Sequence, residues 1–215
     1  MSLVLHNFFR SSASVRVRAA LHLKGLTYTH VSYTLRQEEH RSPAYLSLNP
    51  QGLVPALQLD DGTVVAQSLA IIEYLDEVHP KPLLLPSDPL NRAWVRGLAH
   101  SIASDVHPLN NLRVLQYLGQ ELDVSEAGVT TWFRHWVAES FTALERQLAD
   151  DPRRGQFCHG DSPGLADICL FAQMANNRRF EVDMTHYPTL ATINTNCLEL
   201  PAFVDALPES HPHAG

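Results

Sequence analysis

The order of strand-like and helix-like segments in residues 3–75 limits the fold of this chain more than any other feature. Leu3–Phe8 alternates in the manner of a strand, and Ser14–Lys24 carries apolar residues among basic ones in the manner of a helix. Gly25 is a typical helix end, and the following Thr27–Tyr33 is rich in β-branched and aromatic residues. A strand–helix–strand unit of this kind predicts two parallel strands with a right-handed crossover.

A hairpin and another helix follow. Ala56–Leu59 and Thr63–Ala66 are predicted strands, and the Asp-Gly pair in Asp60–Gly62 is a typical hairpin turn. Ser68 is then expected to cap a helix over Ala70–Leu75. The full order, β-α-β followed by β-β-α, is that of the thioredoxin fold.

The second half of the chain has a different character. Residues 79–89 contain four prolines, a density typical of a linker, and no convincing strand follows them. The expected helices span residues 90–102, 109–122, 125–149, 165–180, 190–198 and 201–207. We therefore predict an α+β protein of two domains, a thioredoxin-like domain over residues 1–82 and an all-helical domain over residues 88–215.

Composition excludes several classes of function. The net charge of −7 and the lack of a basic run argue against a nucleic-acid partner. There is no apolar stretch of about 18 residues to span a membrane, and the first residues do not resemble a signal peptide. The three cysteines, Cys158, Cys169 and Cys197, show no metal or redox spacing. We expect a cytosolic protein without a bound metal.

Two segments of the first domain suggest a binding site. Asn49–Pro55 can hold an extended backbone edge open beside a proline, and Gln67 with Ser68 places polar groups at a helix start, where anions bind well. A serine-rich segment, Arg10–Ser14, opens the first helix. Together these segments predict a site for a small anionic peptide.

The same segments carry a family resemblance that extends over nearly the whole chain. The telling segments are Arg10–Leu21, Leu48–Pro55, Gln67–Leu75, His107–Asn111, Gly160-Asp161 and Ala166-Asp167. In this order and spacing they resemble the zeta class of cytosolic glutathione transferases, which includes the maleylacetoacetate and maleylpyruvate isomerases. The resemblance implies the glutathione transferase fold, glutathione as cofactor and a homodimer.

Two positions depart from the family pattern. Ala13 replaces the signature cysteine, which need not abolish isomerisation because the thiol of glutathione does the chemistry in this family. Gly164 replaces the usual Ser or Thr three residues before Asp167. Glycine caps a helix nearly as well, and Asp167 can still accept from the Gly164 amide, so we expect the helix to form.

Glutathione is reactive as a thiolate, and thiols at helix N-termini can titrate near or below pH 7. The resemblance assigns sulfur activation to Ser11, then Ser12, with Ser14 also near the sulfur. Their hydroxyl and backbone N–H groups can donate to a sulfur, and the helix dipole adds to the effect. The alternative is that these serines only cap the helix.

Other residues are expected to hold the rest of the tripeptide. Val54 should pair its backbone with the cysteinyl unit beside a cis Pro55, and Gln67 and Ser68 should bind the γ-glutamyl carboxylate. Ordinary turn and capping roles are the alternatives. The resemblance further places His40 near the glycyl end and His107 and Asn111 at the tripeptide from the helical domain.

A maleyl-type substrate carries two carboxylates, so a net-negative protein must concentrate positive charge where it binds. Arg10, Arg113 and Arg179 are the candidates for substrate binding, because arginine can grip carboxylates with two parallel hydrogen bonds. Arg10 adjoins the expected thiolate site and is a candidate for catalysis as well. Arg178 is expected to be a solvated surface charge. For Arg10, Arg113 and Arg179, a solvated surface charge is the alternative to substrate binding.

Arg16 and Arg18, within the first helix, are expected to be charges on the helix face or interface residues.

The expected function is glutathione-dependent cis–trans isomerisation of maleylacetoacetate or maleylpyruvate in aromatic catabolism, such as tyrosine degradation. Thiolate addition to the cis double bond, rotation and elimination would give the trans isomer without consuming glutathione. Two alternatives stay open. One is a transferase that conjugates or dehalogenates small haloacids, and the other is a glutathione-fold binding protein without turnover.

Overall fold

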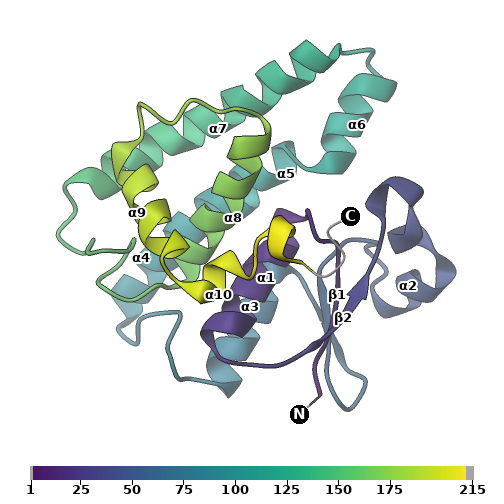
Figure 1. The fold of residues 1–215 in the computed structure, drawn as a ribbon, viewed down its shortest axis with the longest axis horizontal. Coiled ribbons are helices and arrows are strands. Elements are labelled where there is room, and N and C mark those ends of the chain that lie inside the picture. The colour runs from purple at the N-terminus through teal and green to yellow at the C-terminus, as the bar shows by residue number, and fades with distance from the viewer. Residues whose placement is uncertain (1, 212–215) are drawn as a thin grey trace. The chain divides into compact units, whose positions relative to one another are not determined.

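The computed structural model describes residues 2–211, so the outer ends of the two expected domains, residue 1 and residues 212–215, lie outside the described residues. The chain divides into two compact units (Figure 1). The first unit combines Met1–Leu84 with Leu200–Gly215, and the second is Leu85–Glu199. The expected helical range of 88–215 therefore differs from the structure at its C-terminal end.

The first unit contains the predicted β-α-β and β-β-α order. Its elements are β1 (Val4–Asn7), α1 (Ser12–Leu23), β2 (Thr29–Ser32), β3 (Ala56–Gln58), β4 (Val64–Ala66) and α3 (Ser68–Val78). The sheet has the order β2-β1-β3-β4, with β2 parallel to β1 and the other two pairs antiparallel. Leu5 lies between His30 and Leu57 and is fully buried, so the centre of this sheet belongs to the core.

Three short helical elements between β2 and β3 escaped prediction. They are η1 (Leu35–Gln37), η2 (Glu39–Arg41) and α2 (Pro43–Leu48). The start of α2 has a recognisable signal, because the Ser42 hydroxyl accepts from the Tyr45 N–H at 3.3 Å and Pro43 occupies the first turn. The element is only six residues long, which leaves little apolar periodicity to detect.

The start of α3 differs from the predicted cap. The N-cap residue is Gln67, with a left-handed φ of 72° and no side-chain cap, and Ser68 is the first helical residue. The Ser68 hydroxyl accepts instead from Nη1 of Arg16 at 3.1 Å. The predicted capping role of Ser68 is therefore wrong, because Ser68 is itself the first helical residue and Gln67 occupies the cap position.

Arg16 and Arg18 are buried, at 3% and 1% exposure, so the first of their two predicted roles, a charge on the helix face, is wrong. Arg18 donates to the Ala206 carbonyl through Nε and Nη2, at 3.0 and 2.8 Å. It also donates to the Phe9 carbonyl at 2.9 Å and to Asn7 Oδ1 at 3.0 Å. Burial lowers the pKa of Arg18 to about 10, which still leaves the guanidinium charged at neutral pH.

The same arginine explains why the C-terminal segment belongs to the first unit. This segment contains α10 (Pro201–Val204) and η4 (Pro208–Ser210), and α10 packs against α1 (Figure 1). Phe203 is fully buried there, and the Ala206 carbonyl receives the Arg18 guanidinium. The sequence predicts a short helix here but does not predict that it packs against α1.

The second unit is helical, as predicted. Its elements are α4 (Pro89–His100), the π-helix η3 (Ser101–Val106), α5 (His107–Leu109), α6 (Leu112–Gln120), α7 (Glu126–Ala149), α8 (Leu165–Arg179) and α9 (Pro188–Leu198). The helix that was predicted to end at residue 102 continues instead as a π-helical stretch and then as α5. The helix ends after Leu109, and α6 begins at Leu112. Asn111 causes this break, because its Oδ1 accepts from the Arg113 N–H at 3.2 Å and caps α6.

Helix α8 forms the centre of this unit, and nearly all of it is buried, including Cys169 as expected. Asp167 accepts from the backbone N–H of Gly164 at 2.8 Å and of Cys158 at 2.7 Å. The prediction that Asp167 bonds the Gly164 amide is confirmed. Burial raises the pKa of Asp167, and the two backbone donors oppose that shift.

We predict that Arg18→Met lowers the free energy of unfolding by about 3 kcal/mol, because two buried oxygens and one part-buried oxygen lose their donor. Denaturant titration followed by circular dichroism measures this change. Arg36→Met, at an exposed arginine of the same unit, is the matched control and should leave stability unchanged. A wild-type midpoint for Arg18→Met would contradict the prediction.

Candidate functional site

The start of α1 brings the predicted serines together. Ser11 is the N-cap, and its hydroxyl accepts from the Ser14 N–H at 3.3 Å. The first turn contains no acidic side chain, so the partial positive charge of the helix end is not neutralised there. Ser11 is half-buried and Ser12 is 5% exposed. Ser11 is therefore the more exposed of the two residues, and it is a cap as well as a candidate sulfur ligand.

Ser14 does not fit its predicted role. Its side chain is fully buried, and its hydroxyl lies 3.5 Å from the Phe8 N–H. Ser14 therefore lies in the core at the first turn of α1. Arg10, by contrast, is exposed directly before Ser11, with its guanidinium 5.0 Å from the centre of the Phe9 ring.

The loop before β3 has the predicted open edge. The Val54–Pro55 peptide bond is cis, as predicted. Asn49 shapes the loop, because its Nδ2 donates to the Leu53 carbonyl at 2.7 Å and its Oδ1 accepts from the Gln51 N–H at 3.2 Å. No residue within 2–211 hydrogen-bonds to the N–H or C=O of Val54. Both groups can therefore pair with an extended ligand.

Gln67 and Ser68 lie together at the start of α3, as predicted. Gln67 is exposed, and its Nε2 donates to Gln51 Oε1 at 2.7 Å. Ser68 is 6% exposed and is held by Arg16. The helix end has no side-chain cap from its N-cap residue and no acid in its first turn, so it can accept an anion.

His40 lies in η2 of the same unit and is half-buried. Its Nδ1 is buried without a hydrogen-bond partner in the described part of the chain. Burial, and then the nearby Arg41, lower the pKa of His40 below its usual value. The lowered pKa favours the neutral imidazole, which can act as a hydrogen-bonding group.

In the helical unit, the structure brings His107 and Asn111 together, with Asn111 Nδ2 at 3.3 Å from His107 Nε2. Arg113 and Arg179 are both exposed. The guanidinium of Arg179 lies 5.9 Å from the centre of the Phe180 ring.

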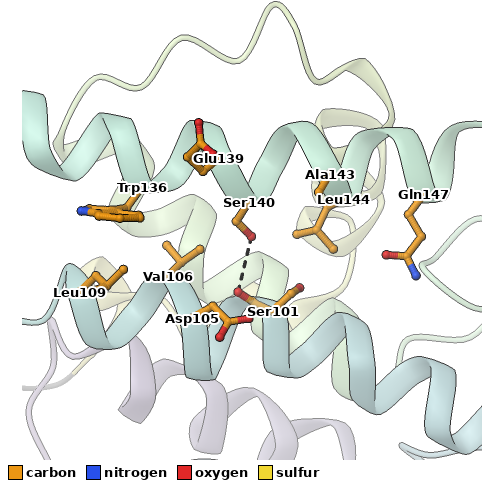
Figure 2. A pocket seen from close by; sticks show the side chains of 10 residues that line it. All are labelled: Ser101, Asp105, Val106, Leu109, Trp136, Glu139, Ser140, Ala143, Leu144 and Gln147. Atoms are coloured by element: carbon orange, nitrogen blue, oxygen red, sulfur yellow. Dashed lines mark hydrogen bonds between the residues drawn. The ribbon is translucent and has the colours of Figure 1, made fainter.

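A pocket of about 310 Å³ lies elsewhere in the helical unit, between α7 and the chain from η3 to α5 (Figure 2). Trp136 and Leu144 contribute apolar surface, and Ser140 Oγ donates to the Ser101 carbonyl at 3.4 Å across it. None of the predicted site residues lines this pocket. Pocket size therefore does not identify the site, and the predicted site residues lie instead at the helix starts and the loop before β3.

Known proteins match this chain along its whole length. A family model described as the glutathione S-transferase N-terminal domain matches residues 10–78. Maleylpyruvate isomerase of Ralstonia sp is 46% identical over 209 residues, which cover 97% of this chain and 98% of the relative. A solved holo structure of maleylpyruvate isomerase, described as a bacterial glutathione S-transferase of the zeta class, is 44% identical, with a TM-score of 0.96 and coverage of 99% and 100%.

The chain belongs to the zeta class of glutathione transferases. A structure of maleylacetoacetate isomerase from Methylobacterium extorquens AM1 is also similar, with 36% identity, a TM-score of 0.95 and 99% coverage of both chains. It was solved with bound malonate and glutathione. The predicted family and fold are thereby confirmed.

The cysteines of this zeta-class chain are poor nucleophiles. All three are free and buried. Burial raises the pKa values of Cys158 and Cys197, which disfavours their thiolates. Within residues 2–211, no cluster of His, Cys, Asp or Glu could hold a metal ion, and no helix is both long and apolar enough to cross a membrane. Since Ala13 occupies the signature position and all three cysteines are buried, the described residues offer no exposed thiol.

Two residues of the site were missed by sequence reasoning. Asn49 was seen only as part of a loop, although its side chain shapes that loop from both ends. Arg16 was expected to be a charge on the helix face or an interface residue, although it contacts Ser68. A signal existed for Arg16, because Val15, Val17 and the apolar residues after them leave α1 with little polar surface.

Proposed function

We propose that this protein is a glutathione-dependent cis–trans isomerase of maleyl-type keto acids, either maleylpyruvate or maleylacetoacetate, in the breakdown of aromatic compounds. The observation that carries the proposal is the start of α1. There, the half-buried Ser11 and the free helix end can stabilise a thiolate in a chain that has no reactive sulfur of its own. The names of full-length relatives support the same reaction.

The described residues fit glutathione. Val54 offers an unpaired backbone N–H and C=O to the cysteinyl unit, and Gln67 and Ser68 offer polar groups at a helix end to the γ-glutamyl carboxylate. His40 offers a neutral imidazole to the glycyl end. For His107 and Asn111, family resemblance supports a glutathione contact, and their mutual hydrogen bond fixes the two side chains.

When bound, glutathione supplies a thiolate that adds to the cis double bond and leaves again after rotation, so it is not consumed. The protein's part is to keep the sulfur charged. Ser11 and Ser12 can donate hydrogen bonds to it, and the dipole of α1 favours negative charge. A thiol pKa lowered by about two units corresponds to about 2.7 kcal/mol of preference for the thiolate.

The substrate's carboxylates require local positive charge. Arg10 is exposed directly before Ser11, so it can act on a substrate that reacts at this helix end. Arg113 and Arg179 are exposed arginines of the helical unit, and family resemblance supports their role in binding a dicarboxylate. Malonate in the Methylobacterium relative shows that a member of this family can bind two carboxylates.

One assay tests the function. The protein is mixed with maleylpyruvate or maleylacetoacetate and a catalytic amount of glutathione, and absorbance is followed. Turnover far above the glutathione supplied would establish isomerisation. Stoichiometric loss of glutathione with a haloacid, without isomerisation, would instead indicate a transferase. Glutathione binding without any turnover would indicate a binding protein, and both of these results would refute the proposal.

We also propose that the protein acts in the cytosol as a homodimer. Three free cysteines fit a reducing compartment, and the homodimer is inferred from the family. Light scattering tests the second statement, since a mass of 24.0 kDa in solution would rule out the dimer.

We predict that Ser11→Ala lowers kcat about 100-fold while glutathione still binds, because a donor to the developing charge is lost. Steady-state kinetics and a binding titration measure the two effects. The lost cap costs about 1 kcal/mol of stability, so assays are run well below the unfolding temperature. Ser47→Ala, at an exposed serine of the same unit, is the control. An unchanged kcat would remove Ser11 from the mechanism.

We predict that Arg179→Leu raises KM for the dicarboxylate about tenfold and spares a neutral acceptor, because only the former needs the charge. The neighbouring Arg178→Leu is the matched control, since both side chains are exposed at the end of α8. An equal loss with both acceptors would mean that Arg179 has a structural role.

A further inference from the structure

The contact between Arg16 and Ser68 joins two helices of the first unit. Arg16 lies in α1 and is 3% exposed, and Ser68 is the first residue of α3 and is 6% exposed. Nη1 of Arg16 donates to Ser68 Oγ at 3.1 Å. A buried cation is therefore placed directly behind a hydroxyl at an open helix end.

The direction of this hydrogen bond decides what the hydroxyl can do. Guanidinium groups have no acceptor, so Ser68 Oγ must be the acceptor and its own proton must point elsewhere. Among the residues that the structure describes, the Ser68 hydroxyl donates to none. Its proton is therefore available to a ligand oxygen, and the donor behind it fixes the position of the oxygen.

The surroundings select an anion as that ligand. The first N–H groups of α3 lack a side-chain cap from Gln67, and the first turn has no acid. A hydrogen bond from a cation also polarises the hydroxyl and makes it a better donor. A carboxylate hydrogen-bonded to Ser68 would in addition feel the charge of Arg16 through a poorly screened interior.

We propose that Arg16 is a positioning residue for the γ-glutamyl carboxylate of glutathione, acting through the Ser68 hydroxyl. This inference rests on the proposed function, which assigns that carboxylate to Ser68. The carboxylate takes no part in bond making, so the contact strengthens the ground state and the transition state alike. Arg16 therefore governs glutathione affinity and leaves kcat at saturating glutathione nearly unchanged.

The first experiment compares Arg16→Met with the wild type. Calorimetric titration should show about tenfold weaker glutathione binding, the size expected for losing a charge-assisted contact. The kcat at saturating glutathione should stay within about twofold. Arg16→Lys keeps the charge and should recover part of the affinity, and it also serves if Arg16→Met fails to fold. Arg36→Met, at an exposed arginine, should change neither quantity.

A second ligand separates this role from a merely structural one. An analogue of glutathione with the γ-glutamyl α-carboxylate converted to an amide lacks the charge that Arg16 is proposed to recognise. Wild-type protein should prefer glutathione to this analogue, and Arg16→Met should lose most of that preference. A loss of affinity that is equal for both ligands would overturn the inference.

A double-mutant cycle tests the route through Ser68. If Arg16 acts through the hydroxyl, adding Arg16→Met to Ser68→Ala should weaken glutathione binding by less than about twofold. Full additivity, or unchanged binding in Arg16→Met alone, would overturn the inference. The proposed carboxylate site itself fails only if Ser68→Ala leaves glutathione affinity unchanged, so the two failures are distinguishable.

Discussion

A buried guanidinium without a charged partner in its hydrogen bonds holds the first unit together. Arg18 donates to a side-chain oxygen at the end of β1, to the Phe9 carbonyl before α1 and to the Ala206 carbonyl of the C-terminal segment. A cation in the interior is costly unless its donors are satisfied. The hydrogen bonds of Arg18 therefore hold these three chain segments together. These bonds also restrict the position of Ser11, because the short segment Arg10-Ser11 joins Phe9 to α1.

The far end of α1 is fixed by a second buried cation. Lys24 Nζ forms an ion pair with Asp76 of α3 at 2.7 Å and also donates to the His79 and Pro82 carbonyls. Arg16 in the first half of α1 contacts Ser68, so Arg16, Arg18 and the C-cap residue Lys24 each bind a different neighbour. Helix α1 thus acts as a rigid support for the two helix starts at which the sulfur and the carboxylate are proposed to bind.

The part of the proposed site that would hold the sulfur, the cysteinyl backbone and the γ-glutamyl carboxylate consists mainly of neutral groups. Hydroxyls of Ser11 and Ser68, the backbone of Val54 and two helix ends offer hydrogen bonds without a full charge. This design suits a ligand that brings its own charges and its own sulfur. Because the reactive sulfur would come from glutathione, replacement of the signature cysteine by Ala13 leaves the family's chemistry possible, although the cysteines of the protein are all buried.

Several features followed from the sequence because their physics is local. The strand and helix order, the Asp61-Gly62 turn and the bond from Gly164 to Asp167 each depend on neighbouring residues. The resemblance located Ser11, Val54, Gln67 and Ser68 at the helix starts and the open edge where the structure has them. What these residues bind stays a prediction for the experiments described above.

Other features were decided only by tertiary structure, because the partners are distant in the chain. Arg18 donates to a carbonyl 188 residues away and Arg16 to a serine 52 residues away, so the sequence alone suggested only helix-face charges or interface residues. The packing of the C-terminal segment against the first unit and the burial of Ser14 were likewise not predicted from the sequence. The sequence determined which elements form, and folding decided which of their polar groups are buried and what each one holds in place.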